Sequence, residues 1–410
     1  MRNWITDVAR SFAVVLGSLG LLAAFTALAW TPPAAEADEL QARQESVLRG
    51  RQLVIEHGCG GCHGGFDNPA AEGWLAGLMS ASQEFPIGPC GAEGDDTCFL
   101  TRPRNLTPHP TTGIGRFSER QIFNALRFGL RPGETADVEI TSTVPGEGNY
   151  PMFPKYLAPP MPWHAWRHMP DEDLWAIAAY LKEGLKPVDN FVPDSEGPPD
   201  FWVSTYTVEA FGTHPAQPFP TGNEVEPPSG VDRELVVRGR HLVIQHACGD
   251  CHGGLTNPAA PGWLAGIVDG AGAFPAGPCL EDPEAPCFMQ RPRNLTPHPT
   301  AGTGRWTERQ LFNAIRHGLR PSGNPDAAIT AANFPVNADL LGPGMPWGEF
   351  RHMPDQDIRA IVAYLRNGLK PVDNVVEESD RPAEGWSDTF ESLLGGYPAP
   401  PFPTAREVGG

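Results

Sequence analysis

Basic residues are scarce in this chain. Its 410 residues include 30 lysines and arginines against 49 aspartates and glutamates, which gives a formal net charge of −19 at pH 7. Such an acidic chain is repelled by nucleic acid and by a strongly anionic membrane surface, so we expect neither as a partner. A partner that presents a basic docking patch is the natural expectation, although an acidic surface also serves solubility.

Strand-like alternation is missing as well. No segment of any length alternates apolar and polar residues with the period of two that marks a half-buried strand. Glycine and proline number 46 each, which predicts many loops and short helices. The expected fold class is therefore all-α. At 410 residues the chain is long enough for two domains of moderate size.

Cysteine is rare, and all eight cysteines fall into two repeated patterns. The first pattern is C-x-x-C-H, which is the attachment sequence for c-type haem. Two thiols form thioethers to one haem, and the adjacent histidine supplies the proximal iron ligand. A zinc knuckle needs two further ligands at close spacing, and a thioredoxin-like pair has no use for the histidine. The sequence predicts two covalent haem c groups attached through Cys59, Cys62, Cys248 and Cys251, with His63 and His252 as axial ligands.

The second cysteine pattern consists of two pairs with equal spacing. Cys90 with Cys98, and Cys279 with Cys287, each enclose seven residues. We predict that both pairs are disulfides, with free buried thiols as the alternative. Disulfides persist in oxidising compartments, and bacterial haem attachment also takes place outside the cytoplasm. Both patterns therefore indicate a periplasmic protein.

The amino terminus explains how the chain leaves the cytoplasm. Residues 11–30 carry no charge and follow Arg2 and Arg10. This run has the length of a membrane span and exceeds the usual apolar region of a signal peptide. An acceptable cleavage site ends at Ala37. We favour a retained hydrophobic helix as an inner-membrane anchor, with cleavage of a signal peptide as the alternative.

An internal repeat organises the rest of the chain. The residues around Cys59 recur around Cys248 at an offset of 189, and Met161 recurs as Met345 at an offset of 184. Two Pro-rich segments also correspond, and we expect each to pack as a strap across the domain that it follows. The predicted parts are a signal peptide or anchor at 1–37, a first domain at 46–195, a strap or linker at 196–229, a second domain at 230–378 and a C-terminal strap at 379–410.

Local signals place the helices of each copy. A short helix at about 46–57 leads into the first haem motif. Ser118, followed by glutamine three residues later, forms a capping box for a second helix, and Thr307 repeats it. The last helix of the first copy is expected to begin with Pro170 in its first helical position, followed by acidic residues at the positive end of the helix dipole.

The order of helix, C-x-x-C-H, loop and Met-Pro loop before a final helix resembles class I cytochrome c domains. The Asn-Leu-Thr-Pro stretch from Asn105, the Met-Pro-Trp at Met161 and the Asp-Glu-Asp-Leu at Asp171 resemble cytochrome subunits of periplasmic bacterial dehydrogenases. The resemblance covers roughly 46–190 and 235–374, and it implies two tandem domains. Those subunits typically carry three haem domains, whereas this chain has two, so the choice of dehydrogenase partner does not carry over.

The resemblance also implies a sixth iron ligand, because class I domains use a methionine on an extended loop. Met161 and Met345 are the expected ligands. Met161 lies between prolines, which restrict the loop. Met169 and Met353 lie directly before the last helix, where we expect core packing.

Other residues are candidates for contacts with the haem. His109 and His298, each in a Thr-Pro-His-Pro loop, are rival sixth ligands, and a bis-histidine iron would have a lower potential. Trp163 and Trp347 either line the haem pocket through the indole N–H or simply pack. Four arginines flank prolines and either pair with haem propionates or form ordinary surface salt bridges: Arg102, Arg104, Arg291 and Arg293.

These features predict an electron-transfer protein with two His/Met haems. Six-coordinate iron has no position for a substrate, so we expect no catalysis at either haem. The alternative is a haem enzyme with one open iron, either a di-haem peroxidase or a thiosulfate-oxidising cytochrome. The same methionine loop in both copies argues against such a division of labour. A haem-based gas sensor would need an open site and an output domain, and no output domain is visible.

Overall fold

The computed structural model describes residues 34–79, 84–87, 99–196, 205–268, 272–276, 279, 284–285, 287–380, 390 and 394–409. The predicted anchor at 11–30 and the pair Cys90 and Cys98 lie outside these residues. The chain divides between Gln41 and Ala42, and the larger unit, Ala42–Gly410, contains both C-x-x-C-H motifs. No helix among the described residues is long and apolar enough to cross a membrane.

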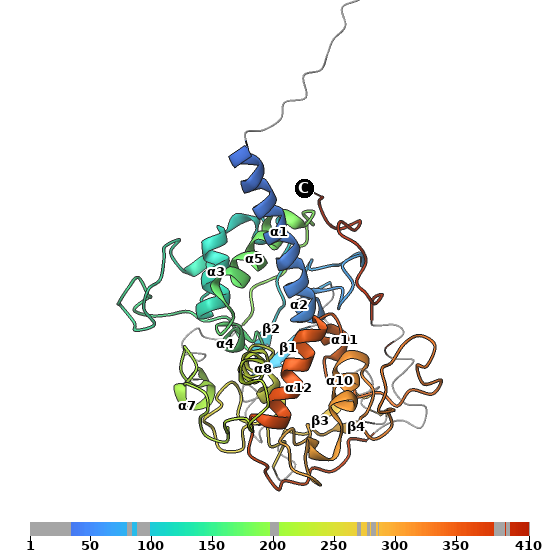
Figure 1. Cartoon of the computed structure of the whole chain (residues 1–410). Helices are drawn as coiled ribbons and strands as arrows, with labels where there is room; N and C mark the ends of the chain where they lie inside the picture. The colour runs from blue at the N-terminus through green and yellow to red at the C-terminus, as the bar shows by residue number, and fades with distance from the viewer. Residues whose placement is uncertain are drawn as a thin grey trace, which may run out of the picture. The chain divides into compact units, whose positions relative to one another are not determined.

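Short helices joined by loops make up the first copy (Figure 1). Its elements are α1 (Ala34–Glu56), α2 (Cys59–His63), β1 (Phe85–Ile87), β2 (Phe99–Thr101), the 3₁₀ turn η2 (Ile114–Arg116), α3 (Glu119–Phe128), the 3₁₀ turn η3 (Pro132–Glu134), α4 (Trp163–Trp166), α5 (Asp171–Ala179) and the π-helical turn η4 (Tyr180–Gly184). α1 is longer than the helix expected at 46–57. Pro170 caps α5 from outside, so it does not occupy the first helical position as expected.

The second copy repeats this order after a short helix in the linker. Its elements are α7 (Val208–Phe211) in the linker, then α8 (Arg233–Gln245), α9 (Cys248–His252), β3 (Phe274–Ala276), β4 (Phe288–Gln290), the 3₁₀ turn η6 (Thr303–Arg305), α10 (Glu308–His317), α11 (Trp347–Phe350) and α12 (Asp355–Asn367). Both predicted capping boxes are confirmed, at Ser118 before α3 and at Thr307 before α10.

The expectation of a purely helical chain needs one correction. β1 pairs with β2 and β3 pairs with β4, each as an antiparallel ladder of three residues per strand. Three residues are too few for a period of two to stand out in the sequence. Along the chain, each ladder follows a C-x-x-C-H helix and precedes the next long helix, which is α3 in the first copy and α10 in the second.

Two hydrophobic cores form where the first and last helices of each copy cross. The crossings are close because Gly50 and Gly239 lack a side chain. A Cβ atom on Gly50 would lie 1.8 Å from the carbonyl oxygen of Ala176, and one on Gly239 would lie 1.9 Å from that of Ala360. Any larger residue would separate these helices and open the core.

Each core contains a buried chain of polar groups that ends on a strap. The indole N–H of Trp74 donates to the hydroxyl of Tyr180 at 2.9 Å, and this hydroxyl donates to Glu407 at 2.6 Å. Glu407 also accepts from Arg51 at 2.6 Å. The second copy repeats the arrangement with Trp263, Tyr364, Arg240 and Glu224.

The straps therefore pack differently from the prediction. Glu224 belongs to the strap that follows the first copy but completes the core of the second copy, and Glu407 of the C-terminal strap completes the core of the first. Among the described residues, the earlier part of each strap contacts its own copy. Tyr206 contacts Trp163 with ring centroids 4.6 Å apart, and Phe390 contacts Trp347 at 4.7 Å. The two copies thus exchange the ends of their straps.

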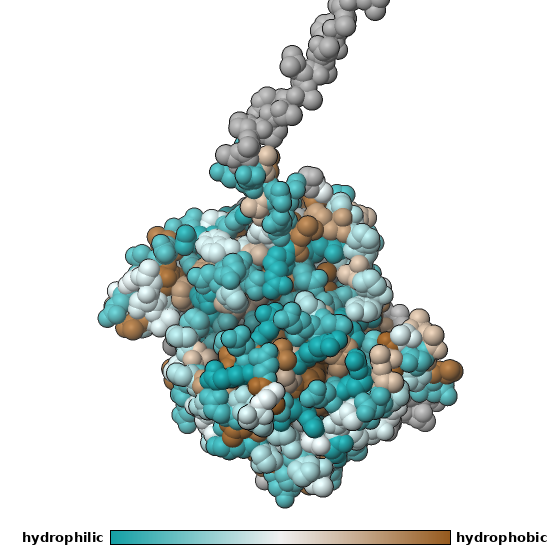
Figure 2. All heavy atoms as spheres, in the orientation of Figure 1, coloured by the Kyte–Doolittle hydropathy of each residue, from teal (hydrophilic) through white to brown (hydrophobic). Residues whose placement is uncertain are grey.

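The surface agrees with the acidic composition of the chain. On the face drawn in Figure 2, hydrophilic side chains predominate and hydrophobic ones are scattered between them. The exposed large apolar side chains include Phe153 at 83% and Val336 at 99% exposure. Single exposed apolar residues are normal on folded proteins and need no special function.

Candidate haem sites

The two C-x-x-C-H motifs form the short helices α2 and α9. Both helices follow a residue with left-handed backbone geometry, Gly58 at φ 65° and Ala247 at φ 53°. One helical turn places the two cysteines of each motif, three residues apart, on the same side. None of these four cysteines is paired in a disulfide.

The motif histidines are oriented by backbone carbonyls. Nδ1 of His63 lies 2.7 Å from the carbonyl oxygen of Arg104, and Nδ1 of His252 lies 2.7 Å from that of Arg293. A carbonyl only accepts hydrogen bonds, so Nδ1 carries the proton and Nε2 keeps its lone pair for a metal. Burial lowers the pKa of both rings, although the carbonyl contact opposes this shift, and the neutral form is the ligating one.

A cavity of about 410 Å³ adjoins the second motif. Both cysteines of the motif, His252 and both candidate methionines, Met345 and Met353, line it. Apolar side chains such as Leu295 and Phe350 supply much of the remaining wall. Two thiols, a neutral imidazole and a thioether on one largely apolar cavity are the donor set that haem c requires, so the residues present fit this group.

The loops that carry the candidate methionines are attached to the small ladders. In the first copy the hydroxyl of Thr101 donates to the carbonyl of Pro159 at 3.0 Å. In the second copy the backbone N–H of Gly344 donates to Gln290, which stands at the position equivalent to Thr101, at 3.0 Å. These bonds give each ladder a role in placing the methionine loop.

The two methionine pairs differ in burial. Met169 and Met353 are each 2% exposed and belong to the two hydrophobic cores. Met161 and Met345 are partly buried and pack against the edges of these cores. This difference favours Met161 and Met345 as the loop ligands, and the assignment stays a prediction.

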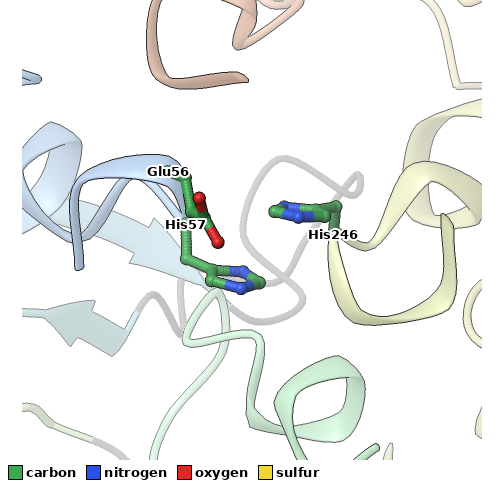
Figure 3. Close-up of side chains that lie close together, drawn as sticks. All are labelled: Glu56, His57 and His246. Atoms are coloured by element: carbon green, nitrogen blue, oxygen red, sulfur yellow. The ribbon is translucent and has the colours of Figure 1, made fainter. Parts of the chain in front are cut away.

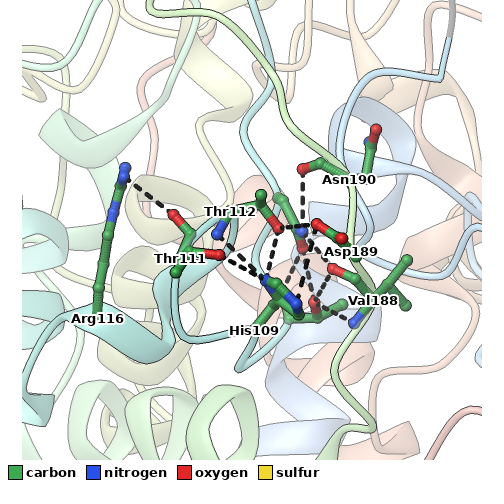
Figure 4. Close-up of polar contacts among 9 residues, drawn as sticks. His109, Thr111, Thr112, Arg116, Val188, Asp189 and Asn190 are labelled. Atoms are coloured by element: carbon green, nitrogen blue, oxygen red, sulfur yellow. Dashed lines mark hydrogen bonds and ion pairs between the residues drawn. The ribbon is translucent and has the colours of Figure 1, made fainter.

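His109, a rival ligand, is held by its own loop (Figure 4). Its Nδ1 accepts from the backbone N–H of Thr112 at 3.2 Å, and the Thr112 hydroxyl lies 2.7 Å from the same nitrogen. Its Nε2 lies 3.9 Å from Asp189. His298 repeats this arrangement in the second copy, with Ala301 N–H at 3.0 Å. These contacts indicate that both histidines brace their loops.

All four candidate propionate-binding arginines form ion pairs with carboxylates. Arg102 contacts Glu84 and Glu196 at 2.6 and 2.7 Å, and Arg104 pairs with Asp194. Arg291 pairs with Asp380 at 2.8 Å and Arg293 with Glu378 at 2.7 Å. Arg291 and Arg293 also line the cavity of the second copy, so a contact with haem propionates stays a prediction there.

One of the two predicted disulfides falls among the described residues. Cys279 and Cys287 lie at disulfide distance, with Cα atoms 5.1 Å apart. The spacing is compatible with a normal bridge. The geometry supports the predicted pairing, which still requires a chemical test.

Sequence reasoning missed the polar contacts between the two copies. The guanidinium of Arg351 and the imidazole of His352 both donate to Asp67, at 3.1 and 2.9 Å. His57 and His246 stack with ring centroids 4.1 Å apart. One signal was available: the position equivalent to Asp67 in the second copy is Thr256, and such differences between copies mark places where their roles differ.

No family model matches the chain, but curated proteins do. The fructose dehydrogenase cytochrome subunit of Gluconobacter japonicus is 27% identical over 80% of this chain and 53% of its own length. The cytochrome c subunit of a quinone alcohol dehydrogenase of Gluconacetobacter polyoxogenes is 28% identical over 90% and 62%. The gluconate 2-dehydrogenase cytochrome c subunit of Pantoea cypripedii is 28% identical over 90% and 67%.

The matched part therefore spans between half and two thirds of the length of these relatives. Their names agree with the resemblance expected from the motifs, because each is a cytochrome subunit of a bacterial dehydrogenase. Over most of its length, this chain is similar to c-type cytochrome subunits of bacterial dehydrogenases.

Proposed function

We propose that this chain is an electron-transferring c-type cytochrome with two haem c groups, one in each copy. The strongest support is the cavity of the second copy, which is lined by Cys248, Cys251, His252 and Met345. Haem iron supplies one-electron transfer between its ferric and ferrous states. The cytochrome names of the relatives support the same class of function.

The residues of the chain have three tasks in this proposal. The cysteines hold the cofactor covalently, and the carbonyls of Arg104 and Arg293 keep the Nε2 atoms of His63 and His252 free to bind iron. Met161 and Met345 would supply a second protein ligand to each iron. A thioether is a soft ligand that favours ferrous iron, so His/Met ligation raises the potential above that of a bis-histidine site.

The donor is, in this proposal, a dehydrogenase subunit outside this chain. The relatives are cytochrome subunits of fructose, alcohol and gluconate dehydrogenases, which supports this class of donor without selecting a substrate. The net charge of −19 supports a partner with a basic docking patch. We further propose a periplasmic location, with residues 11–30 as the inner-membrane anchor or as part of a cleaved signal peptide.

Carbon monoxide binding to the reduced protein tests the proposal, because carbon monoxide binds only to open ferrous iron. We expect two haems per chain and no carbon monoxide binding in the unchanged protein. Met161→Ala should open one haem to carbon monoxide and remove half of the weak long-wavelength band of a methionine–ferric iron bond. Met169→Ala is the matched control and should leave both signals intact.

Two outcomes would contradict the proposal. Stoichiometric carbon monoxide binding in the unchanged protein would identify an open iron and favour the haem enzyme. A full long-wavelength band in a Met161→Ala, Met345→Ala double variant would transfer the ligand role to Met169 and Met353.

A further inference from the structure

Two histidines from different copies meet at the junction between the haem motifs (Figure 3). His57 follows the end of α1, two residues before Cys59, and His246 follows the end of α8, two residues before Cys248. Their rings stack with centroids 4.1 Å apart and an interplanar angle of 10°. Neither histidine has a part in the proposed haem ligation.

The imidazole nitrogens of this pair are buried without partners. Nδ1 of His57 and both Nδ1 and Nε2 of His246 have no hydrogen-bond partner among the described residues. The side chain of His246 is almost fully buried, since the residue is only 8% exposed. Buried polar groups in native proteins nearly always have a partner, because leaving one unsatisfied is unfavourable. A neutral imidazole has one N–H and one lone pair, so a group bound by the lone pair would satisfy one nitrogen of each ring.

A carboxylate adjoins the two imidazoles. Glu56 is 3% exposed, and its side chain accepts a hydrogen bond from Gln52 at 3.0 Å. Burial raises the pKa of Glu56 to about 7. Among the described residues no lysine or arginine forms an ion pair with it, because the nearby Arg49 and Arg238 are paired with Asp173 and Asp357. Glu56 thus forms no ion pair among the described residues, although the charge of Arg49 partly opposes the rise of its pKa.

We propose that Glu56, His57 and His246 bind one divalent metal ion of the zinc type. The three side chains each offer a ligand atom, and these atoms lie within 4.8 Å of one another. Two imidazoles and a carboxylate form a known zinc donor set, in which water completes a tetrahedral shell. Imidazole and carboxylate also suit Zn²⁺ better than the alkaline-earth ions, which prefer oxygen ligands alone.

Binding requires a modest rearrangement of the pair. Each ring nitrogen holds its lone pair in the plane of the ring, so the lone pairs of two stacked, parallel rings do not point at a common position. One ring must therefore turn about its Cβ–Cγ bond before both can bind the same ion. A cavity of about 580 Å³, lined by all three residues, provides room for this turn and for a water ligand. Burial lowers the pKa of His246 to about 3, which keeps its ring neutral and able to ligate.

Such an ion would connect the two copies directly beside both haem attachment points. His57 belongs to the first copy and His246 to the second, so the ion would hold the two motifs at a fixed separation. The second copy has Gln245 where the first has Glu56, so only one of these two equivalent positions supplies a carboxylate. The proposal is independent of haem ligation, because it uses none of the haem ligands.

Calorimetric titration of the metal-depleted, haem-loaded full chain with Zn²⁺ at pH 7.5 tests the site. We expect one Zn²⁺ per chain and a rise in melting temperature. Two variants each remove one proposed ligand: Glu56→Gln introduces the residue found in the second copy, and His246→Phe keeps a flat ring. Each should weaken Zn²⁺ binding by more than about 100-fold, because loss of a metal ligand lowers affinity more than loss of a residue that only supports a ligand. His214→Phe, in the same cavity, and His109→Phe are controls that should bind Zn²⁺ normally.

Absence of Zn²⁺ binding, or normal binding by Glu56→Gln and His246→Phe, would overturn the proposal. So would loss of binding in the His214→Phe control, because it would place the ion elsewhere in the cavity. Anomalous diffraction from Zn²⁺-soaked crystals of the unchanged chain gives a second test that needs no variant. Data above and below the zinc edge separate zinc from haem iron, and the expected zinc peak lies between His57 and His246.

Discussion

Asp67 and Thr256 occupy equivalent positions, each four residues after the histidine of a C-x-x-C-H motif, yet they connect the two copies differently. Asp67 accepts hydrogen bonds from Arg351 and His352 of the second copy and from the backbone N–H of Gly395. Thr256 instead donates its hydroxyl to the carbonyl of Phe211 at 3.0 Å. At these two equivalent positions, the contact of Asp67 is therefore ionic and that of Thr256 is neutral.

The arginines opposite these residues show the same difference. Arg351 pairs with Asp67, whereas its counterpart Arg167 donates to the backbone carbonyls of Phe211 and Gly212 at 2.9 and 3.0 Å. Burial lowers the pKa of Arg167 to about 10. The repeated sequence thus keeps its internal framework in both copies, while the contacts between the copies diverge, because equivalent residues of the two copies face different surroundings.

The exchanged strap ends are expected to give the largest effects. Glu224→Ala and Glu407→Ala each leave a buried arginine without its carboxylate, so each should lower the free energy of unfolding by about 3–5 kcal/mol. Glu224→Ala should be the more damaging, because the side chain of Arg240 is 2% exposed against 11% for Arg51. Urea unfolding of the haem-loaded protein measures both. Glu226→Ala, from an exposed pair with Arg233, is the control and should change little. Equal stability of all three variants would show that the exchange contributes nothing.

A moderate effect is expected at the ionic side of the junction. Asp67→Thr, which gives the first copy the residue of the second, should cost about 2–3 kcal/mol, because Arg351 keeps the carbonyls of Gly348 and Gly395 as partners. Thr256→Ala removes one neutral hydrogen bond and should cost about 1 kcal/mol. Urea unfolding compares the two variants. A larger loss from Thr256→Ala than from Asp67→Thr would reverse the proposed order.

The smallest expected effect is the pH dependence of that ionic contact. Burial opposes ionisation of Asp67, but hydrogen bonds from His352 and Gly395 and the charge of Arg351 outweigh it and lower the pKa of Asp67. The stabilisation is therefore fully present above the ordinary aspartate pKa of about 4 and is lost as the pH falls toward the lower folded-state pKa. Unfolding of the unchanged protein and of Asp67→Thr at pH 7 and pH 3 should show a smaller difference at pH 3. A difference that does not change with pH would mean that Asp67 contributes no ionic stabilisation.

Some of the structure follows from residues close together in the chain. The starts of α3 and α10 were predictable because a capping box involves only residues three positions apart. The helical turn of each C-x-x-C-H motif is equally local. The short ladders were not predictable, because Phe85–Ile87 and Phe99–Thr101 are too short to show a period.

The sequence by itself determined the repeat, the eight cysteine positions, the haem motifs and the likeness to dehydrogenase cytochrome subunits. These are properties of residue type and short spacing. Only the tertiary structure decided which copy receives each strap end, because Arg51 and Arg240 are the same residue at equivalent positions, and either could pair with Glu224 or Glu407. For the same reason, the meeting of His57 with His246 depends on the packing of the two copies against each other, which no spacing along the chain encodes.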